Sequence, residues 1–283
     1  TAALMAMTAA GCDYVSDGRF ILGLGASGPQ VIEGFHGVPF DKPMQRIKEY
    51  IDVCRNVWAR EAPLEYHGKT IDIPLPAGQG TGLGKALKII NHPVRKDIPI
   101  WWASLKDKSV EATAEIADGW LPIMFYPERY HNVWGDQLKA GLAKRDPSRA
   151  RLEISAGGML AIDDSLTGDA QKKILDMARP NMALYVGGMG ARGKNFYNDI
   201  CRDYGFEKEA VDIQDFYLEG KKDEAAAAIP HEWIMNANLV GSTGFIKERV
   251  AAFKESGVTV LSVNPVGPDP VGQIEQLRAI IDA

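Results

Sequence analysis

The stretch IPIWWASLKDKSVEATAEIADGWLPIMF, residues 98–125, decides the fold. It opens with an apolar run over 98–103 and continues with apolar residues at helical spacing over 108–117. It then turns at Asp118-Gly119 and returns to an apolar run over 120–125. Short apolar runs bounded by turn residues are typical of strands buried on both faces. The stretch therefore predicts strand, helix and strand in succession, the repeating unit of a parallel α/β sheet.

The same rhythm continues on both sides of this stretch. We expect strands over 19–25, 98–103, 120–125, 152–162 and 258–263, and helices over 1–15, from Pro43, over 108–117, from Pro127 to about 144, over 243–256 and over 271–282. Residues 64–71 predict a hairpin with its turn at His67-Gly68. Loops are expected over Val31–Pro43 and over 74–84. Residues 163–238 predict helices and no strand.

Five strands near residues 19, 98, 120, 152 and 258 leave two fold classes open. A (β/α)8 barrel requires eight strands, and this chain opens on a helix, so the barrel is expected to lack its first three strands here. The alternative is an open parallel α/β sheet that uses the five strands as they stand. We treat residues 1–283 as one domain with an insertion at 163–238, before the last strand.

The stretch GRFILGLGASGPQ, residues 18–30, runs from an apolar strand into a loop of small residues, Gly25, Ala26, Ser27 and Gly28. A buried strand that delivers such a loop brings backbone N–H groups close to a flat or phosphorylated ligand. The same glycines also suit a plain tight turn between strand and helix. The motif alone does not decide between a cofactor loop and a turn.

Composition and charge exclude several classes of protein. The chain is 46% hydrophobic and 24% charged, which is ordinary for a globular protein, and its net charge of −5 argues against a nucleic-acid binder. Cys12, Cys54 and Cys201 are too widely spaced for a disulfide framework or a zinc site, and a reducing cytoplasm fits them best. No apolar run reaches the roughly 18–20 residues of a membrane span. We predict no metal.

The chain resembles the bacterial luciferase-like monooxygenase superfamily, and within it the oxidoreductases that depend on coenzyme F420, a deazaflavin. The stretches that carry the resemblance are GRFILGLGASGPQVIEGFHGVPFDKP (18–43), PIWWASLKDKSVEATAEIADGWLPIMF (99–125), LYVGGMGARGKNFYNDICRDYGF (184–206) and LVGSTGFIKERVAAFKESGVTVLSV (239–263). They occur in family order and at family-like spacing. The resemblance implies a (β/α)8 (TIM) barrel with an insertion before the last strand.

The resemblance also implies where the cofactor binds. It gives Gly25, Ala26, Ser27 and Gly28 contacts with the cofactor, and it assigns the cofactor phosphate to Ala103, Ser104 and Leu105. A helix N-terminus with a serine hydroxyl suits an anion, although Ser104 is equally read as a helix cap. Many relatives have a small residue near Lys106, whose side chain here either pairs with the phosphate or points to solvent.

A second glycine-rich loop resembles a family segment that closes over the barrel mouth. It contributes Gly188, Met189 and Gly190 as cofactor contacts, with Arg192 on the phosphate or on the glutamyl tail of the cofactor. The alternative is a glycine-rich crossover with a surface arginine. His36 and Glu33 are weak candidates for catalysis, since a lone histidine is more often structural.

The remaining conspicuous residues are expected to be structural. Trp101 and Trp102 alternate faces, so at most one fills the barrel interior, and core packing is expected for Trp120, Phe125 and Tyr126. Cys54 is expected to be an inert core thiol, and Asp118, Asp163 and Asp164 are expected to be turn or cap carboxylates.

We therefore predict a cytoplasmic oxidoreductase that uses coenzyme F420 for hydride transfer with a small organic substrate. One alternative is an FMN-dependent, flavin-using monooxygenase of the same superfamily, and the other is a non-catalytic, truncated member. We expect a homo-oligomer, a homodimer, with no nucleic-acid or membrane partner.

Overall fold

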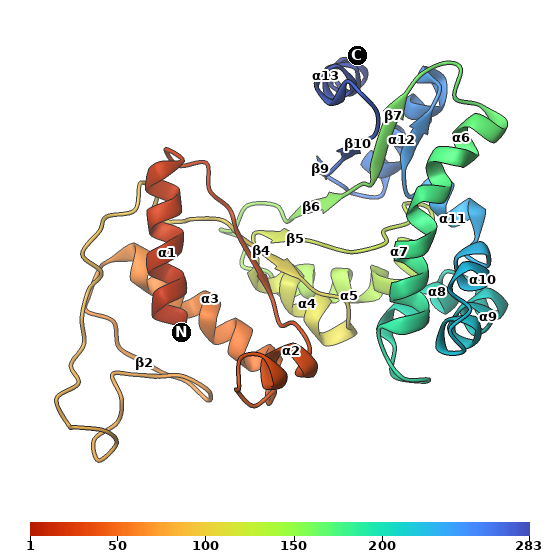
Figure 1. Cartoon of the computed structure of the whole chain (residues 1–283). Coiled ribbons are helices and arrows are strands. Elements are labelled where there is room, and N and C mark those ends of the chain that lie inside the picture. The colour runs from red at the N-terminus through yellow and green to blue at the C-terminus, as the bar shows by residue number, and fades with distance from the viewer. The chain divides into compact units, whose positions relative to one another are not determined.

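The structure is a computed structural model that describes all residues, 1–283. They form two compact units, which are described separately. The first comprises Thr1–Ser104, Ala112–Trp120 and Arg145–Leu152, and the second comprises Leu105–Glu111, Leu121–Lys144 and Glu153–Ala283. Figure 1 labels the elements. None of the helices combines the length and the apolar character that a membrane crossing needs.

The first unit contains most of the elements that the sequence predicts before residue 120. They are α1 (Ala2–Val15), β1 (Leu22–Gly25), α2 (Pro29–Gly34), α3 (Pro43–Ala59), β2 (Tyr66–His67), β3 (Asp72–Ile73), β4 (Ile100–Ala103), the end of α4 (Asp107–Ile116) and β5 (Gly119–Trp120). Helix α2 overlaps the segment expected to be a loop, because Pro29 suits the first turn of a helix. Strands β2 and β3 pair Tyr66 with Ile73, so the turn lies after His67 rather than at it.

Strands β1, β4 and β5 form a parallel sheet whose register gives it two distinct faces. Leu22 and Leu24 of β1 pair with Ile100 and Trp102 of β4. Side chains alternate along a strand, so these four share one face, and all four are buried. In β5, Trp120 pairs with Trp102 and is also buried. The parallel strands expected at 19–25 and 98–103 are confirmed. The strand expected over 120–125 is wrong in its bounds, because β5 comprises Gly119–Trp120 and residues 121–125 are not in a strand.

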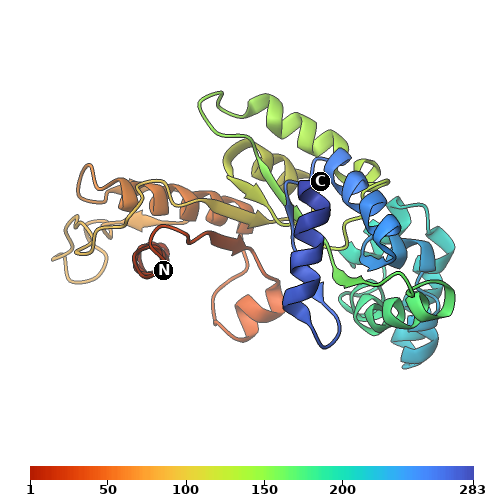
Figure 2. The same cartoon turned by 90° about the horizontal axis from the view of Figure 1, so that it is seen from above.

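Helices α1 and α3 cover this apolar face, and they lie side by side in Figures 1 and 2. Helix α1 contributes small residues, including Ala6 and Ala9, which allow close approach to α3. The indole Nε1 of Trp58 donates a hydrogen bond to the carbonyl oxygen of Ala6 at 2.9 Å. The core of the first unit therefore lies on the helix-covered face of the sheet, and the opposite face is left free of this core.

A buried carboxylate attaches the β2–β3 hairpin to α3. Glu49 accepts hydrogen bonds from the backbone N–H groups of Lys69 and Thr70 at 2.6 and 2.9 Å, from the Thr70 hydroxyl at 2.6 Å and from Gln45 at 2.8 Å. A Cβ at Gly68 would lie 2.5 Å from the Glu49 carboxyl carbon, so glycine is required there. Burial alone would raise the pKa of Glu49, but the hydrogen bonds outweigh it and lower the pKa to about 2.

Acid is therefore expected to destabilise the protein through Glu49. Because its folded-state pKa lies below the ordinary 4.5, its contribution is complete above pH 4.5 and is lost as the pH falls toward 2. The loss amounts to about 2 kcal/mol of unfolding free energy between about pH 6 and about pH 3. Urea unfolding at the two pH values measures it. The variant Glu49→Gln should be less stable than wild type at pH 6 and should show a smaller acid-induced loss.

The second unit is mainly helical. Its elements are the start of α4, α5 (Tyr130–Lys144), β6 (Glu153–Ala156), β7 (Met159–Ile162), α6 (Gly168–Leu175), η1 (Asp176–Ala178), α7 (Arg179–Ala183), the π-helical turn η2 (Leu184–Gly188), α8 (Phe196–Asp203), α9 (Glu207–Leu218), α10 (Lys222–Ala227), α11 (His231–Asn236), β8 (Leu239–Gly241), α12 (Thr243–Glu255), β9 (Val260–Leu261), β10 (Asn264–Pro265) and α13 (Pro270–Asp282). Parallel pairs join β6 to β9, β10 to β7 and β7 to β8.

Two expectations for this unit need correction. The single strand expected over 152–162 is split, because Gly157 adopts a φ of 154° and a Cβ there would lie 2.3 Å from the Ser262 carbonyl oxygen. Leu239–Gly241 forms a parallel strand, β8, and Asn264–Pro265 forms another, β10, although no strand is expected at either place. The helices expected over 163–238, 243–256 and 271–282 are confirmed. The helix after Pro127 begins only at Tyr130.

Candidate functional site

The face of the first unit's sheet that lies opposite the core consists almost entirely of residues without a bulky side chain. We call it the small-residue face, and its members are Gly23, Gly25, Trp101, Ala103 and Gly119. The pairs Gly23–Trp101, Gly25–Ala103 and Trp101–Gly119 are directly opposite in the register. Gly25 and Ala103 are exposed and lie at the carboxyl ends of β1 and β4. The structure thus brings together two residues predicted to contact a cofactor that are far apart in the sequence.

Trp101 is the large side chain on this face. A Cβ at Gly119 would lie 2.4 Å from Cδ1 of Trp101, so the indole lies against the Gly119 backbone. Trp102 points to the opposite face and is 1% exposed. The expected alternation of the two tryptophans is confirmed. The sequence left open which of them faces away from the core, and only the pairing of Trp101 with glycines on both neighbouring strands identifies it.

The loop after β1 leaves the sheet through small residues. Gly25 has strand backbone, and a Cβ there would meet only Ala103, at 3.8 Å, so the fold does not require glycine. Ser27 adopts a φ of 56°, a conformation that costs a non-glycine residue about 1 kcal/mol. Gly28 is extended and precedes α2. Ala26 is half-buried and packs against the core. The loop is therefore both a turn and an open, small-residue surface.

Ser104 uses its side chain inside the protein. Its hydroxyl lies 2.8 Å from that of Thr113, its carbonyl oxygen accepts the Trp120 indole N–H at 3.0 Å, and the residue is 4% exposed. Helix α4 starts later, with the Ser109 hydroxyl accepting the Lys106 N–H at 3.0 Å. The Ser104 hydroxyl therefore does not cap α4, and its contact with a cofactor phosphate stays a prediction.

The variant Ser104→Ala is therefore expected to cost about 1 kcal/mol of unfolding free energy, through loss of the hydroxyl contact with Thr113. It should leave the affinity for a phosphate-bearing cofactor within about twofold of wild type. Urea unfolding and a fluorescence titration with the cofactor measure the two effects. A drop in affinity of tenfold or so at unchanged stability would mean that the hydroxyl reaches the phosphate after all.

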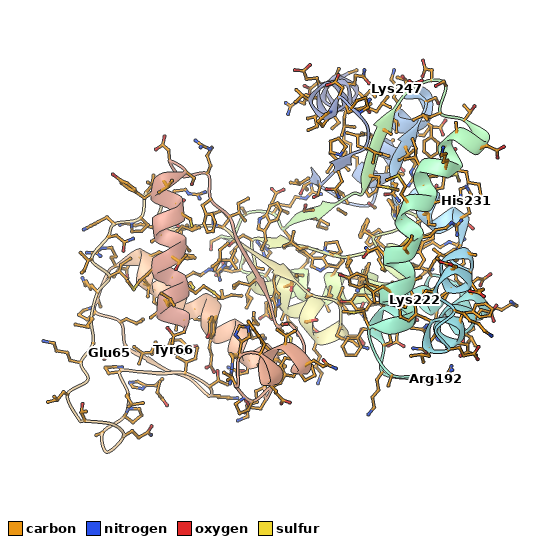
Figure 3. The ribbon with its side chains drawn as sticks, viewed as in Figure 1. Glu65, Tyr66, Arg192, Lys222, His231 and Lys247 are labelled. Carbon is orange, nitrogen blue, oxygen red and sulfur yellow. The ribbon has the colours of Figure 1, made fainter.

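The second glycine-rich loop is packed against α9. A Cβ at Gly188 would lie 2.3 Å from the Tyr217 ring, and one at Gly190 would lie 2.6 Å from the Lys194 carbonyl oxygen. Arg192 is 58% exposed and forms an ion pair with Asp215 of α9. Figure 3 labels it on the loop before α8. Packing thus accounts for the glycines as a crossover, and cofactor contact by these residues, with the half-exposed Met189 nearby, stays a prediction.

The two catalytic candidates lie on the surface around α2. Glu33 accepts the backbone N–H of Phe40 at 3.1 Å. The exposed His36 ring lies edge-on to Phe35, with 5.2 Å between the ring centroids. Both side chains thus make contacts within the same segment, and their part in catalysis stays a prediction.

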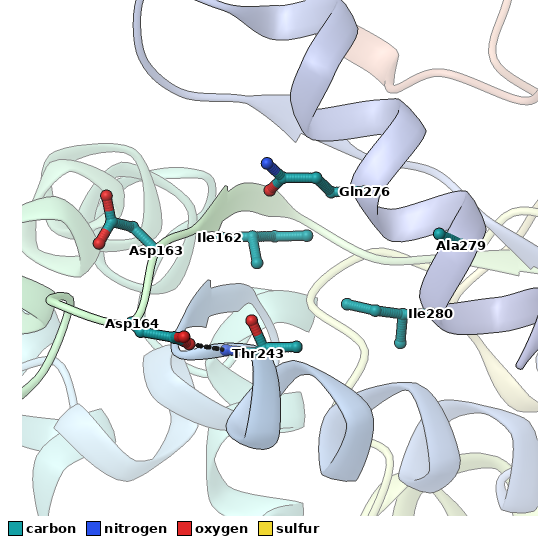
Figure 4. A pocket seen from close by; sticks show the side chains of 7 residues that line it. All are labelled: Ile162, Asp163, Asp164, Thr243, Gln276, Ala279 and Ile280. Carbon is teal, nitrogen blue, oxygen red and sulfur yellow. Dashed lines mark hydrogen bonds between the residues drawn. The ribbon is translucent and has the colours of Figure 1, made fainter.

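The residues that are expected to have structural roles are buried or hydrogen-bonded within the protein. Trp120, Phe125 and Tyr126 are at most 3% exposed. Cys54 is buried, and burial raises its thiol pKa to about 12, which makes it unreactive. Asp118 accepts the Ile100 N–H at 2.9 Å. Asp163 accepts the backbone N–H of Ser165 at 2.8 Å. Asp164 accepts the backbone N–H of Thr243, the first residue of α12, at 2.9 Å. Figure 4 shows the last contact beside a pocket of the second unit.

Comparisons with known proteins agree with the predicted family. The family model for luciferase-like monooxygenases matches residues 1–260. A Mycobacterium tuberculosis protein named as a coenzyme F420-dependent oxidoreductase is 41% identical over 275 residues, which cover 96% of this chain and 76% of that protein.

Solved structures share the fold. The coenzyme F420-dependent tetrahydromethanopterin reductase of Methanopyrus kandleri has a TM-score of 0.70 at 21% identity, over 97% of this chain and 76% of that one. The oxygenating constituent of 3,6-diketocamphane monooxygenase from Pseudomonas putida, in complex with FMN, has a TM-score of 0.57 at 17% identity. The match covers 99% of this chain and 73% of that one. The expected fold class, α/β of the luciferase-like barrel type, is confirmed by these neighbours. The chain belongs to the luciferase-like monooxygenase family.

Proposed function

We propose that this chain is an oxidoreductase that binds coenzyme F420 against the small-residue face and exchanges a hydride with a small organic substrate. The observation that carries the proposal is the pairing of exposed Gly25 with exposed Ala103 at the carboxyl ends of two parallel strands. Ligands of parallel α/β proteins bind at that end of the strands. The relative named as F420-dependent, at 41% identity, supports the choice of cofactor.

The residues fit a flat ring. No side chain longer than a methyl group projects from Gly25 or Ala103, so a ring system can lie against both backbones. Trp101 offers an aromatic surface on the same face. The family resemblance assigns the phosphate to Ala103, Ser104 and Leu105, which precede α4, and the dipole of a helix favours an anion at its N-terminus.

The deazaflavin ring, when bound, supplies the carbon that gives or accepts the hydride. The chain's own residues bind and orient the group. Gly25, Ala103 and Trp101 would hold the ring, and the residues that precede α4 would hold the phosphate. We also propose, from the family resemblance, that Gly188, Met189, Gly190 and Arg192 contact the cofactor. A homodimer and a cytoplasmic location are part of the same proposal.

Titration of the purified chain with coenzyme F420 and with FMN tests the proposal, since a neighbour in the same fold is in complex with FMN. Quenching of tryptophan fluorescence reports binding, and the absorption spectrum of the protein as purified reports any cofactor that it retains. We expect tighter binding of F420. Tight binding of FMN with none of F420 would make the chain a flavin-dependent monooxygenase instead. Binding of neither would favour a non-catalytic family member.

A further inference from the structure

Lys106 directly follows Leu105, the last residue assigned to the cofactor phosphate, and its side chain is already engaged. Its Nζ lies 3.2 Å from Oδ2 of Asp199 in α8 and 4.0 Å from the centroid of the Phe196 ring. The two charged side chains are about half exposed, at 51% and 47%. The Lys106 side chain thus contacts α8 instead of pointing freely into solvent.

The surroundings of Lys106 are acidic. Asp107 opens α4, and Asp199 and Asp203 lie on the facing helix α8. Burial raises the pKa of Asp203, and repulsion from Asp199 and Asp107 raises it further while Lys106 lowers it. The carboxylates of Asp107, Asp199, Asp203 and Glu207 and the ammonium group of Lys106 therefore interact electrostatically. A phosphate dianion at the start of α4 would meet this negative field.

We propose that Lys106 is a positioning residue that sets the affinity for the cofactor phosphate by countering these carboxylates, and that Asp199 reduces this effect by pairing with Lys106. The inference rests on the proposed function. Phe196 and Asp199 hold the ammonium group beside α4, so its position is defined before the cofactor arrives. The phosphate position would therefore be weakly favourable, and the pairing of Asp199 with Lys106 would set the affinity for the phosphate.

Opposite shifts in affinity test this proposal. Lys106→Met keeps an apolar contact with Phe196 but removes the charge, and the dissociation constant for coenzyme F420 should rise about fivefold. Asp199→Asn frees Lys106, and the constant should fall about threefold. Lys106→Arg should stay within about twofold of wild type. The matched control Lys172→Met breaks a Lys–Asp pair on α6, with Asp176 at 2.6 Å, and should leave the constant unchanged.

Salt separates an electrostatic role from a structural one. Both shifts should shrink when the titration is repeated at about 0.5 M instead of about 0.05 M NaCl, because the ions screen exposed charges. Shifts of the same sign for Lys106→Met and Asp199→Asn, shifts that salt does not change, or no shift at all would overturn the inference. A wild-type chain that binds neither F420 nor FMN would instead overturn the proposed function, so the two failures are distinguishable.

Discussion

Replacing Gly25 by valine is expected to raise the dissociation constant for coenzyme F420 roughly tenfold to hundredfold, while the protein stays folded. The fold has room for the side chain, because a Cβ at Gly25 meets only Ala103, at 3.8 Å, and the strand backbone suits a β-branched residue. The proposed position of the cofactor ring has no room for this side chain, because the added methyl groups would lie on the small-residue face that the ring is proposed to contact. Fluorescence titration and urea unfolding of the same preparation measure the two effects.

Two further variants make this result specific. Gly25→Ala adds a single methyl group and should give a smaller loss of affinity than valine. Gly11→Ala adds the same group in α1, where nothing lies within 4 Å, and should leave the affinity unchanged. If Gly25→Val binds F420 as tightly as wild type does, the ring does not lie against β1. A graded loss across alanine and valine, at constant unfolding free energy, would support that position.

The sequence predicts the strands well where apolar runs are bounded by turn residues. Residues 98–103 and 19–25 contain β4 and β1 because each run ends in small residues after a buried stretch. The short strand β8 was missed because Leu239–Gly241 directly precedes the Ser242 cap of α12, and three residues give too little pattern. The break at Gly157 depends on the approach of the Ser262 backbone, from a distant part of the sequence, which no local pattern contains.

The sequence names the candidate site residues but does not contain the orientations of their side chains. Strand order puts Gly25 beside Ala103, and alternation along β4 separates Trp101 from Trp102. The direction of a hydroxyl or an ammonium group depends on partners that folding supplies. Ser104 turns to Thr113, and Lys106 turns to Asp199, a residue of a helix that the sequence does not connect with α4.

The variant Arg95→Met is expected to lower the unfolding free energy by about 3–5 kcal/mol, the largest stability effect predicted for this chain. Asp13 of α1 is fully buried, and its carboxylate accepts hydrogen bonds from the Arg95 backbone N–H at 3.0 Å, from Nε at 3.0 Å and from Nη2 at 2.5 Å. The same guanidinium donates to the Phe20 carbonyl oxygen, just before β1. Without it, a buried charge has no cation, and desolvation makes that state costly.

A double-mutant cycle identifies the cause. Asp13→Asn keeps the size of the side chain but removes its charge. Combining Asp13→Asn with Arg95→Met should therefore recover part of the loss, because no unpaired charge is then buried. Arg46→Met is the matched control. It breaks a pair with Asp41 in which both side chains are at least 31% exposed, and it should cost less than about 1 kcal/mol. Equal costs for Arg95→Met and Arg46→Met would show that burial of Asp13 does not govern the effect. A large cost for Arg95→Met alone means that this pair anchors α1 to the segments entering β1 and β4, and so supports the sheet on which Gly25 and Ala103 meet.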